Sequence, residues 1–522
     1  IIMHYANNPI LPGFRPDPSI CRVGDDYYLV TSSFAYFPGV PVYHSKDLAN
    51  WEQIGHVLTR ESQLHLENAG HSRGIYAPTL RYFQGRYYMI TTNVSHRDNF
   101  IVTAESPEGP WSDPYYLDED APGIDPSLFF DEDEDGTVHC YYVGTRPNQK
   151  HGVRYNGDWE IWVQELDLKT MELIGESKKI WKGAMHHVIW PEGPHLYKKD
   201  GYYYLMNAEG GTGPNHSMTI SRSRSVWGPY EGNPNNPILT HRHLGNDYPI
   251  TAVGHGDLVD DGHGNWYVVM LGSRKCEGYV NTGRDTFLAK VTWEDGWPVV
   301  NPGVGMLESV VELPGGGAEM KPESQVYHFF EKKLPMECMT LRKPLWEKYD
   351  LFQRSGYLRL PTLPQTLNET SCPAFVAVRQ KEYLYLASAG IEFSPCVNGE
   401  EAGLAILCDE THHVRFTKMM CDGKVQLLLN RRLGDKEEKL AAEEIEDGFV
   451  TLEIRGRGQK TDFYYKVQGK EKMLLVSDVD MTGLSTELAG GFTGCCLGMY
   501  ASSNGEISEN HADFAWMAIE NQ

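Results

Sequence analysis

Residues 24–30, with the sequence Gly-Asp-Asp-Tyr-Tyr-Leu-Val, place a Gly/Asp turn directly before an aromatic-led apolar strand. A turn followed by an apolar strand recurs at residues 84–90, 135–141, 200–205 and 264–269. The aligned aromatic residues are separated by 60, 54, 61 and 64 positions and are Tyr27, Tyr87, Tyr141, Tyr202 and Trp266. A period of this length indicates a repeat architecture, in which each copy is one supersecondary unit.

Other short elements surround each copy of this turn and strand. A further strand precedes it, as at residues 127–130 and 195–197, and a hairpin turn joins the two strands. Most copies are followed by a third strand and a polar cap with an aromatic residue, as at residues 45–51 and 225–230. Five units of three or four strands predict a five-bladed β-propeller, which we assign to residues 1–312.

The repeat stops at residues 313–324, a Gly-rich and Pro-containing stretch that we interpret as a linker. Beyond it, residues 325–522 read as a succession of strands, for example at residues 403–407 and 425–429, with turn residues every 8 to 12 positions. This pattern predicts an antiparallel β-sandwich. The whole chain is therefore predicted to be all-β, with two domains.

Composition excludes several classes of partner. The 522 residues carry 71 acidic and 47 basic side chains, a net charge of −24, which argues against nucleic acid or an anionic membrane surface as the main partner. No run of about 18 apolar residues is present, so no membrane-spanning segment is predicted.

Cysteine usage and the first residues suggest a compartment. Ten cysteines occur without a C-x-x-C pair, and residues 1–5 show neither a basic nor an apolar signal region. We expect reduced thiols, no secretory signal and a cytoplasmic location.

Ionisable residues open four of the five repeats: Asp17, Asp125, Glu192 and His255. A propeller brings the start of each innermost strand to one end of a central channel, so these side chains are expected to converge. The alternative is that each Asp-Pro-Ser is a turn in which the Asp side chain bonds its own backbone. Recurrence at the same repeat phase favours a functional cluster.

Three convergent carboxylates suit glycoside hydrolysis. One ionised carboxylate activates water, a second carboxylic acid of raised pKa protonates the leaving oxygen, and the third tunes that acid. Proximity of like charges and burial both raise the pKa of such an acid.

Several motifs resemble glycoside hydrolase family 43, namely residues 8–19, 33–40, 123–127, 192–195 and 283–287. They are most similar to its β-xylosidase and α-L-arabinofuranosidase members with a C-terminal domain, which residues 399–404 also resemble. The resemblance implies that the second domain is a concanavalin A-like sandwich.

The resemblance also implies roles for the carboxylates. Asp17 would be the general base, Glu192 the general acid, and Asp125 the residue that orients the acid and modulates its pKa. The family inverts the anomeric configuration, so we predict that the carboxyl groups of Asp17 and Glu192 lie about 6.5–9.5 Å apart, with room for water between them.

Further site residues follow from the same resemblance. Arg284 would contact sugar hydroxyls, although a salt bridge to Asp285 is an alternative, and Phe34 would form an apolar wall beside the sugar unless it only packs in the core. His255 would lie beneath the carboxylates, where the family can bind a calcium ion through solvent; no cofactor is expected to be required. Tyr76 stands where members often have Trp, which leaves the second subsite open.

The sequence thus predicts an exo-acting inverting hydrolase that releases xylose, arabinofuranose or both from xylo- and arabinoxylo-oligosaccharides. The alternatives are a mainly α-L-arabinofuranosidase activity, an endo-arabinanase and a non-catalytic sugar-binding propeller. An endo-acting enzyme needs an open groove, whereas residues 373–380 of the sandwich could form a loop over the site. A homo-oligomer is a family expectation.

Overall fold

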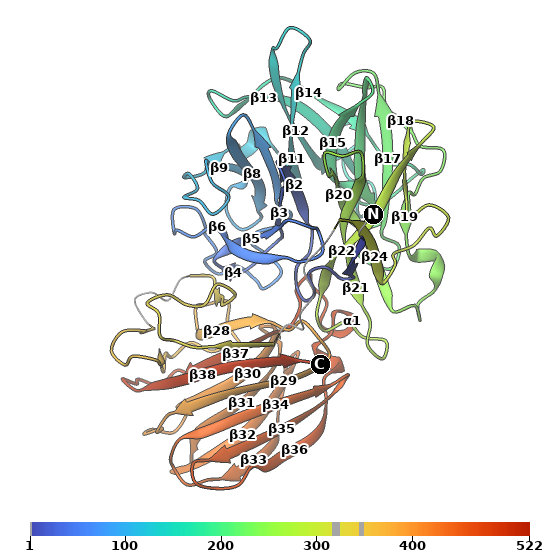
Figure 1. Cartoon of the computed structure of the whole chain (residues 1–522). Coiled ribbons are helices and arrows are strands. Elements are labelled where there is room, and N and C mark those ends of the chain that lie inside the picture. The colour runs from blue at the N-terminus through green and yellow to red at the C-terminus, as the bar shows by residue number, and fades with distance from the viewer. Residues whose placement is uncertain (1–2, 316–323, 344–348) are drawn as a thin grey trace.

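The computed structural model describes residues 3–315, 324–343 and 349–522 and shows two all-β domains side by side (Figure 1). Five antiparallel sheets form the propeller, and each comes from one of the five repeats. Their strands are β2 (Ser19–Val23), β3 (Asp26–Val30), β5 (Gly39–Ser45) and β6 (Glu52–Leu58); β7 (Thr79–Phe83), β8 (Arg86–Asn93), β9 (Asp98–Ala104) and β10 (Tyr115–Tyr116); β11 (Ile124–Glu132), β12 (Val138–Pro147), β13 (Trp159–Asp167) and β14 (Glu172–Trp181); β15 (Glu192–Lys199), β16 (Tyr202–Glu209), β17 (Ser217–Ser223), β18 (Glu231–Gly232) and β19 (Leu239–Thr240); and β20 (Ile250–Asp260), β21 (Trp266–Arg274), β22 (Arg284–Glu294) and β23 (Trp297–Val300). The predicted five-bladed propeller is confirmed.

Most of the aromatic-led strands contain an unbroken apolar run because blades pack on both of their faces. Along β3, Leu29 joins the apolar cluster shared with the fifth blade, and the next residue, Val30, joins the cluster shared with the second blade. Successive strand residues point to opposite faces, so a strand buried on both faces needs an unbroken apolar run. This is the physical origin of the repeated motif.

The first and last strands of the propeller domain pair with each other. β1 (Met3–Asn7) pairs antiparallel with β24 (Val310–Pro314). Residues 316–323, the larger part of the predicted linker, lie outside the described residues, and β24 and β25 border them.

The C-terminal domain packs two antiparallel sheets face to face over one apolar core. The described helical segments are single turns: α1 (Thr486–Ala489) and the 3₁₀ turns at Asp118–Asp120, Arg242–Leu244 and Thr482–Leu484. The sandwich strands are β25 (Ser324–Tyr327), β27 (Leu358–Pro361), β29 (Leu384–Glu392), β34 (Val450–Arg457), β35 (Lys460–Val467), β36 (Met473–Asp480) and β38 (His511–Asn521) in one sheet, and β28 (Ala374–Arg379), β30 (Glu401–Asp409), β31 (His412–Cys421), β32 (Lys424–Leu433), β33 (Lys436–Glu444) and β37 (Cys496–Ser502) in the other.

The domains are joined by more than the connecting chain. β4 (Tyr36–Phe37) of the propeller pairs with β26 (Thr340–Leu341). A buried apolar cluster crosses the boundary and includes Phe14 and Phe34 from the propeller and Phe375 and Tyr500 from the sandwich. Because Phe34 belongs to this cluster, the sandwich packs directly behind one of the predicted site residues.

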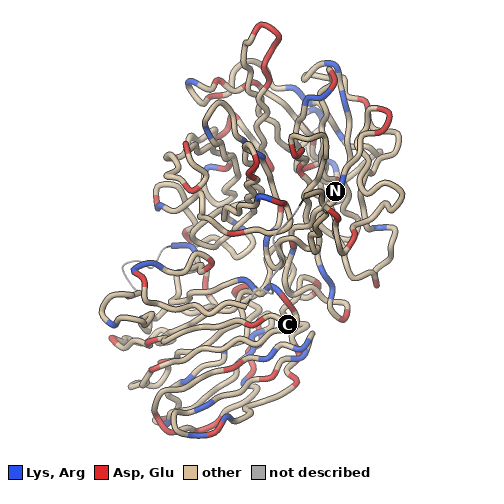
Figure 2. Tube along the Cα trace, viewed as in Figure 1, with Lys and Arg blue, Asp and Glu red and all other residues tan. Residues whose placement is uncertain are grey.

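Charge is spread over both domains. Figure 2 shows acidic and basic residues interspersed along the propeller and the sandwich, with the acidic ones more numerous. None of the ten cysteines forms a disulfide bond. Within the described residues, no helix has the length and apolar character needed to cross a membrane.

Candidate active site

The seven side chains singled out from the sequence line one cavity of about 80 Å³. All five blades contribute. Five of these residues lie in or near the innermost strands β2, β7, β11, β15 and β20, Arg284 begins β22, and Phe34 lies between β3 and β5 of the first blade. The residues are Asp17, Phe34, Tyr76, Asp125, Glu192, His255 and Arg284. The expected convergence at one end of the channel is therefore observed.

Asp17 is buried and held by three donors. Ser32 Oγ donates to its Oδ2 at 2.6 Å, Arg284 Nη1 donates to Oδ1 at 3.1 Å, and His255 Nδ1 lies 3.2 Å from Oδ1. Burial by itself raises the pKa of Asp17, but the charges of Arg284 and His255 outweigh it and hold the pKa well below its usual range. Asp17 is consequently ionised at neutral pH.

The pKa values of Asp125 and Glu192 are shifted upward, opposite to that of Asp17. Burial raises the pKa of Glu192 well above the ordinary value of a glutamic acid, and the nearby Asp125 carboxylate raises it further. Burial raises the pKa of Asp125 as well. The backbone N–H of Gly193 donates to Asp125 Oδ2 at 3.0 Å, so Asp125 is fixed to the residue next to Glu192. Glu192 is thereby kept protonated where Asp17 is not.

His255 packs against the glycine that follows the raised acid. A Cβ at Gly193 would lie 2.8 Å from His255 Cδ2, and Gly193 has φ +59°. Burial lowers the pKa of His255, but its contact with Asp17 and the other carboxylates reverse this and raise the pKa to about 9. His255 therefore carries a positive charge beneath the carboxylates.

Backbone strain gathers at the site. Four of the site residues are non-glycine residues in the left-handed region: Asp17 at φ 53°, Phe34 at 51°, Asp125 at 54° and His255 at 54°. Such conformations cost energy and persist where the surrounding structure enforces them, which occurs often at functional sites.

Arg284 does not form the alternative salt bridge with Asp285. Its guanidinium donates to Asp17, and Nη1 lies 3.4 Å from Thr212 Oγ1. Asp285 instead pairs with Arg274, whose Nε donates at 3.1 Å. The guanidinium of Arg284 therefore makes no ion pair with its neighbour Asp285 and lines the cavity.

The sandwich supplies part of the cavity wall, but through a different segment from the one predicted. Residues 374–379 form strand β28 and not a loop, and Arg379 Nε donates to the carbonyl of Phe14. The side chain that reaches the cavity is Phe492, in a Gly-rich turn. Its ring lies 6.2 Å from that of Phe34 and 6.1 Å from that of Tyr76. The turn is anchored to the propeller because Phe492 N donates to Ser72 Oγ at 2.9 Å.

Sequence reasoning missed five residues of the wall: Ala77, Ile124, Thr212, His216 and Phe492. Thr212 and His216 belong to the turn between β16 and β17, whose Gly-Gly-Thr-Gly run was the available signal. Burial lowers the pKa of His216 to about 4, so its ring is neutral and Nδ1 donates to the carbonyl of Ala252 at 2.9 Å.

The described residues near His255 offer no set of oxygen ligands for direct coordination of a calcium ion. Calcium takes six to eight oxygen ligands, whereas His255 Nδ1 is committed to Asp17. Among the described residues, no three His, Cys, Asp or Glu side chains are grouped so as to hold a metal ion. The carboxylate deeper in the channel, Asp257, is paired with Arg81.

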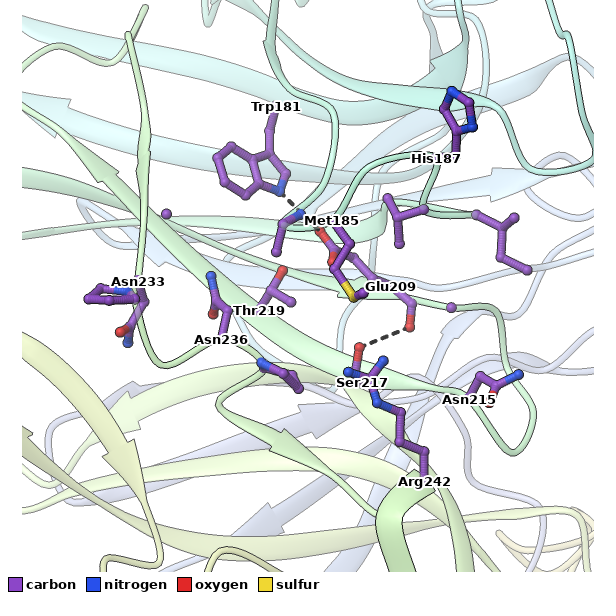
Figure 3. A pocket seen from close by; sticks show the side chains of 17 residues that line it. Trp181, Met185, His187, Glu209, Asn215, Ser217, Thr219, Asn233, Asn236 and Arg242 are labelled. Carbon is purple, nitrogen blue, oxygen red and sulfur yellow. Dashed lines mark hydrogen bonds between the residues drawn. The ribbon is translucent and has the colours of Figure 1, made fainter.

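A larger cavity of about 520 Å³ beside the fourth blade contains none of these seven residues (Figure 3). Its buried carboxylate, Glu209, accepts hydrogen bonds from Trp181 Nε1 at 3.2 Å and from the backbone N–H of Ala184 at 2.7 Å. These bonds link the 181–184 segment to β16. The paired carboxylates needed for hydrolysis are found in the smaller cavity.

Comparison with known proteins agrees with the architecture and the site. Residues 6–298 match "Glycosyl hydrolases family 43", and residues 326–520 match "Beta xylosidase C-terminal Concanavalin A-like domain". This chain belongs to glycosyl hydrolase family 43. Its second domain is accordingly a concanavalin A-like sandwich, as predicted.

Similar family 43 proteins are matched over nearly their full length. A "Xylosidase/arabinosidase" of Butyrivibrio fibrisolvens is 51% identical over 99% of this chain and 100% of its own. A "Non-reducing end alpha-L-arabinofuranosidase" of Bacteroides ovatus is 39% identical over 98% of this chain and 93% of its own. The crystal structure of a xylan beta-1,4-xylosidase from Bacillus halodurans superposes with a TM-score of 0.90, at 36% identity, over 99% of this chain and 100% of that one.

Proposed function

We propose that this family 43 enzyme is an exo-acting, inverting glycoside hydrolase that releases xylose and arabinofuranose from xylo- and arabinoxylo-oligosaccharides. The observation that carries the proposal is that Asp17 and Glu192 line one cavity in opposite environments. Arg284 and His255 lie against Asp17 and lower its pKa, whereas burial and the Asp125 carboxylate raise the pKa of Glu192. Carboxyl groups whose environments separate their pKa values in this way take the base and acid roles.

In the proposed reaction, Asp17 accepts a proton from a water molecule as that water attacks the anomeric carbon. Glu192 donates its proton to the glycosidic oxygen as the bond between carbon and oxygen breaks. The products are a free sugar of inverted configuration and the shortened oligosaccharide. The two carboxyl groups exchange protonation states, and proton exchange with solvent restores them.

The other residues support this exchange. Asp125 raises the pKa of Glu192 and, through the Gly193 N–H, fixes its strand. Arg284 presents a planar fork to sugar hydroxyls, and His255 holds Asp17 in place. The rings of Phe34 and Phe492 form an apolar wall for one sugar face.

Removal of one terminal sugar at a time is favoured over cleavage inside a chain. The small cavity is walled by Phe492 of the sandwich as well as by the propeller. A closed pocket holds a chain end, whereas an endo-arabinanase needs an open groove. The names of the relatives, which mention xylosidase and arabinosidase activities, support both sugars as substrates.

The test compares p-nitrophenyl β-D-xyloside, p-nitrophenyl α-L-arabinofuranoside and xylobiose as substrates for the wild type and Glu192→Ala. We expect the variant to lose about 10²–10⁴-fold in kcat, and to lose more on xylobiose because nitrophenolate needs little acid assistance. Glu172→Ala, on the exposed strand β14, is the control. A wild type that binds xylose but hydrolyses none of the three would favour the non-catalytic alternative.

We propose that the enzyme acts in the cytoplasm on imported oligosaccharides, a location that ten cysteines without a disulfide bond support. Fractionation of the source cells, with the hydrolase followed by activity and antibody, tests this; recovery outside the cytoplasm would contradict it. We also propose a homo-oligomer, which light scattering coupled to gel filtration checks.

A further inference from the structure

Arg81 crosses the central channel of the propeller. It lies on β7 of the second blade, yet its guanidinium contacts Asp257 of the fifth blade and His195 of the fourth. The distances are 2.9 Å from Nη1 to Asp257 Oδ2, 2.9 Å from Nη2 to Asp257 Oδ1, and 3.2 Å from Nη2 to His195 Nδ1. The second blade is adjacent to neither of these blades, so the contacts span the channel.

The carboxylate of Asp257 is fully buried and has a complete set of donors. Besides Arg81, Oδ2 accepts from Ser19 Oγ at 2.8 Å and from the Ile20 N–H at 3.0 Å, and Oδ1 accepts from Tyr197 Oη at 2.5 Å. A carboxylate offers about four lone-pair sites. No oxygen of Asp257 is left for a cation, and the Arg81 charge repels one.

This charged cluster lies just below the proposed catalytic residues along the same strands. Ser19 follows Asp17 by two positions, Asp257 follows His255 by two, and His195 follows Glu192 by three. Irregularities in register lie between Glu192 and His195 and between Gly254 and Asp257, and Asp17 lies just before β2. Asp17, Glu192 and His255 are therefore each within two or three residues of a side chain that belongs to the cluster.

We propose that Arg81, clamped by Asp257, is the built-in cation of the channel: it sets the relative positions of Asp17, Glu192 and His255, and it makes hydrolysis independent of a divalent ion. The inference rests on the catalytic roles proposed above. It departs from the calcium ion that the family resemblance allows near His255. Arg81 is a positioning residue, because the residues it contacts lie below the cavity.

An arginine suits this place better than a lysine. Its planar fork matches both carboxylate oxygens at once and still reaches His195, whereas an ammonium group is a point charge. Removal of the partner from a buried carboxylate strongly destabilises the folded state. Loss of the guanidinium would also leave the Asp257 charge facing His255 and the carboxylates above it.

The test measures kcat, KM and the pH profile of kcat/KM for Arg81→Met and Arg81→Lys on p-nitrophenyl β-D-xyloside. The control is Arg86→Met, an exposed arginine on the next strand. We expect Arg81→Met to lower kcat by about 10²-fold, the loss that misplacement of catalytic groups by about 1 Å produces, with little change in KM. The acidic limb of the kcat/KM profile of Arg81→Met should move to higher pH, because the uncompensated Asp257 charge raises the pKa of Asp17. Arg81→Lys should keep the wild-type pH profile with a partly restored kcat.

A purely structural role for Arg81 predicts another outcome, a lower unfolding temperature with unchanged kcat and pH profile. That result would overturn the positioning role. If Arg81→Met does not fold, the lysine variant decides: a kcat equal to that of the wild type would show that the fork is not needed for positioning.

The cation assignment is tested separately on the wild-type enzyme. After treatment with EDTA and gel filtration, calcium is titrated in by calorimetry and by thermal unfolding, neither of which requires activity. We expect no heat of binding and no change in unfolding temperature, with kcat unchanged. Calcium binding that restores a lost activity would overturn the assignment. A wild type that binds no calcium and hydrolyses no glycoside would instead contradict the proposed function and leave Arg81 as the channel cation.

Discussion

Arg284 Nη1 donates a hydrogen bond to Asp17 Oδ1 at 3.1 Å and so joins the fifth blade to the segment that leads into the first. The two residues are 267 positions apart in the sequence. His255 approaches the same oxygen at 3.2 Å. Asp17 is thus held between two cations, which keeps the proposed base ionised.

Arg284→Met should move the acidic limb of kcat/KM to higher pH. Activity needs an ionised Asp17 and is lost as pH falls through its pKa. The charge of Arg284 lowers that pKa, so its removal raises it. The pH profile with p-nitrophenyl β-D-xyloside checks this, with Arg242→Met, exposed in the larger cavity, as the control. An acidic limb in the wild-type position would show that Arg284 does not set the pKa of Asp17.

Asp125→Asn should move the alkaline limb to lower pH. Glu192 must be protonated to act as the acid, so activity is lost as pH rises through its pKa. Burial raises that pKa first, and the Asp125 charge adds to it. The amide removes the charge, while its side-chain oxygen can still accept from the Gly193 N–H. The pH profile of the variant is measured on p-nitrophenyl β-D-xyloside. An alkaline limb at the wild-type pH would show that burial alone raises the pKa of Glu192.

Gly193→Ala should damage catalysis more than stability explains. Its Cβ would lie 2.8 Å from His255 Cδ2, so the ring that holds Asp17 must shift, and we expect kcat to fall by at least about tenfold. Gly24→Ala is a matched control, since Gly24 has φ +62° and nothing lies within 4 Å of its Cβ position. Both variants bear the left-handed penalty of about 1–2 kcal/mol. The kcat and the thermal unfolding midpoint of both variants are measured. Equal losses of kcat in the two variants would argue against the role of the His255 contact.

Phe492→Ala should weaken substrate binding from the other domain. Its ring lines the cavity beside Phe34 and Tyr76, so the variant loses one aromatic contact with the sugar, worth about 0.5–1.5 kcal/mol, and we expect KM to rise roughly 2–10-fold. Stability should change little because Phe492 is 38% exposed. Leu488→Ala, in the neighbouring exposed turn α1, is the control. A KM equal to that of the wild type would remove the sandwich from the binding site.

Hydrolysis should invert the anomeric centre. Proton NMR at early times should show α-xylose as the first product from a β-xyloside, before mutarotation. This outcome accompanies a carboxyl separation of about 6.5–9.5 Å between Asp17 and Glu192, whereas about 5 Å accompanies retention. A first product of β configuration would contradict both the base role of Asp17 and the predicted separation.

The sequence by itself determined the propeller and the identity of its polar cluster. Strands that bury both faces need unbroken apolar runs, and these runs recur visibly around Tyr27, Tyr87 and Trp266. Because the period is regular, the sequence shows that Asp17, Asp125 and Glu192 occupy the same position within their repeats. A feature that recurs at the same position of each repeat can therefore be predicted from the sequence alone.

Only the tertiary structure decided which groups act on those carboxylates. The contacts from Arg284 to Asp17, from Arg81 to Asp257 and from Phe492 to the cavity join segments far apart in the chain, and no periodicity encodes them. The segment expected over the cavity, residues 373–380, contains an apolar run, and residues 374–379 of it pair as a strand. The direction of each pKa shift likewise depends on burial and on neighbouring charges, which exist only once the blades have closed around the channel.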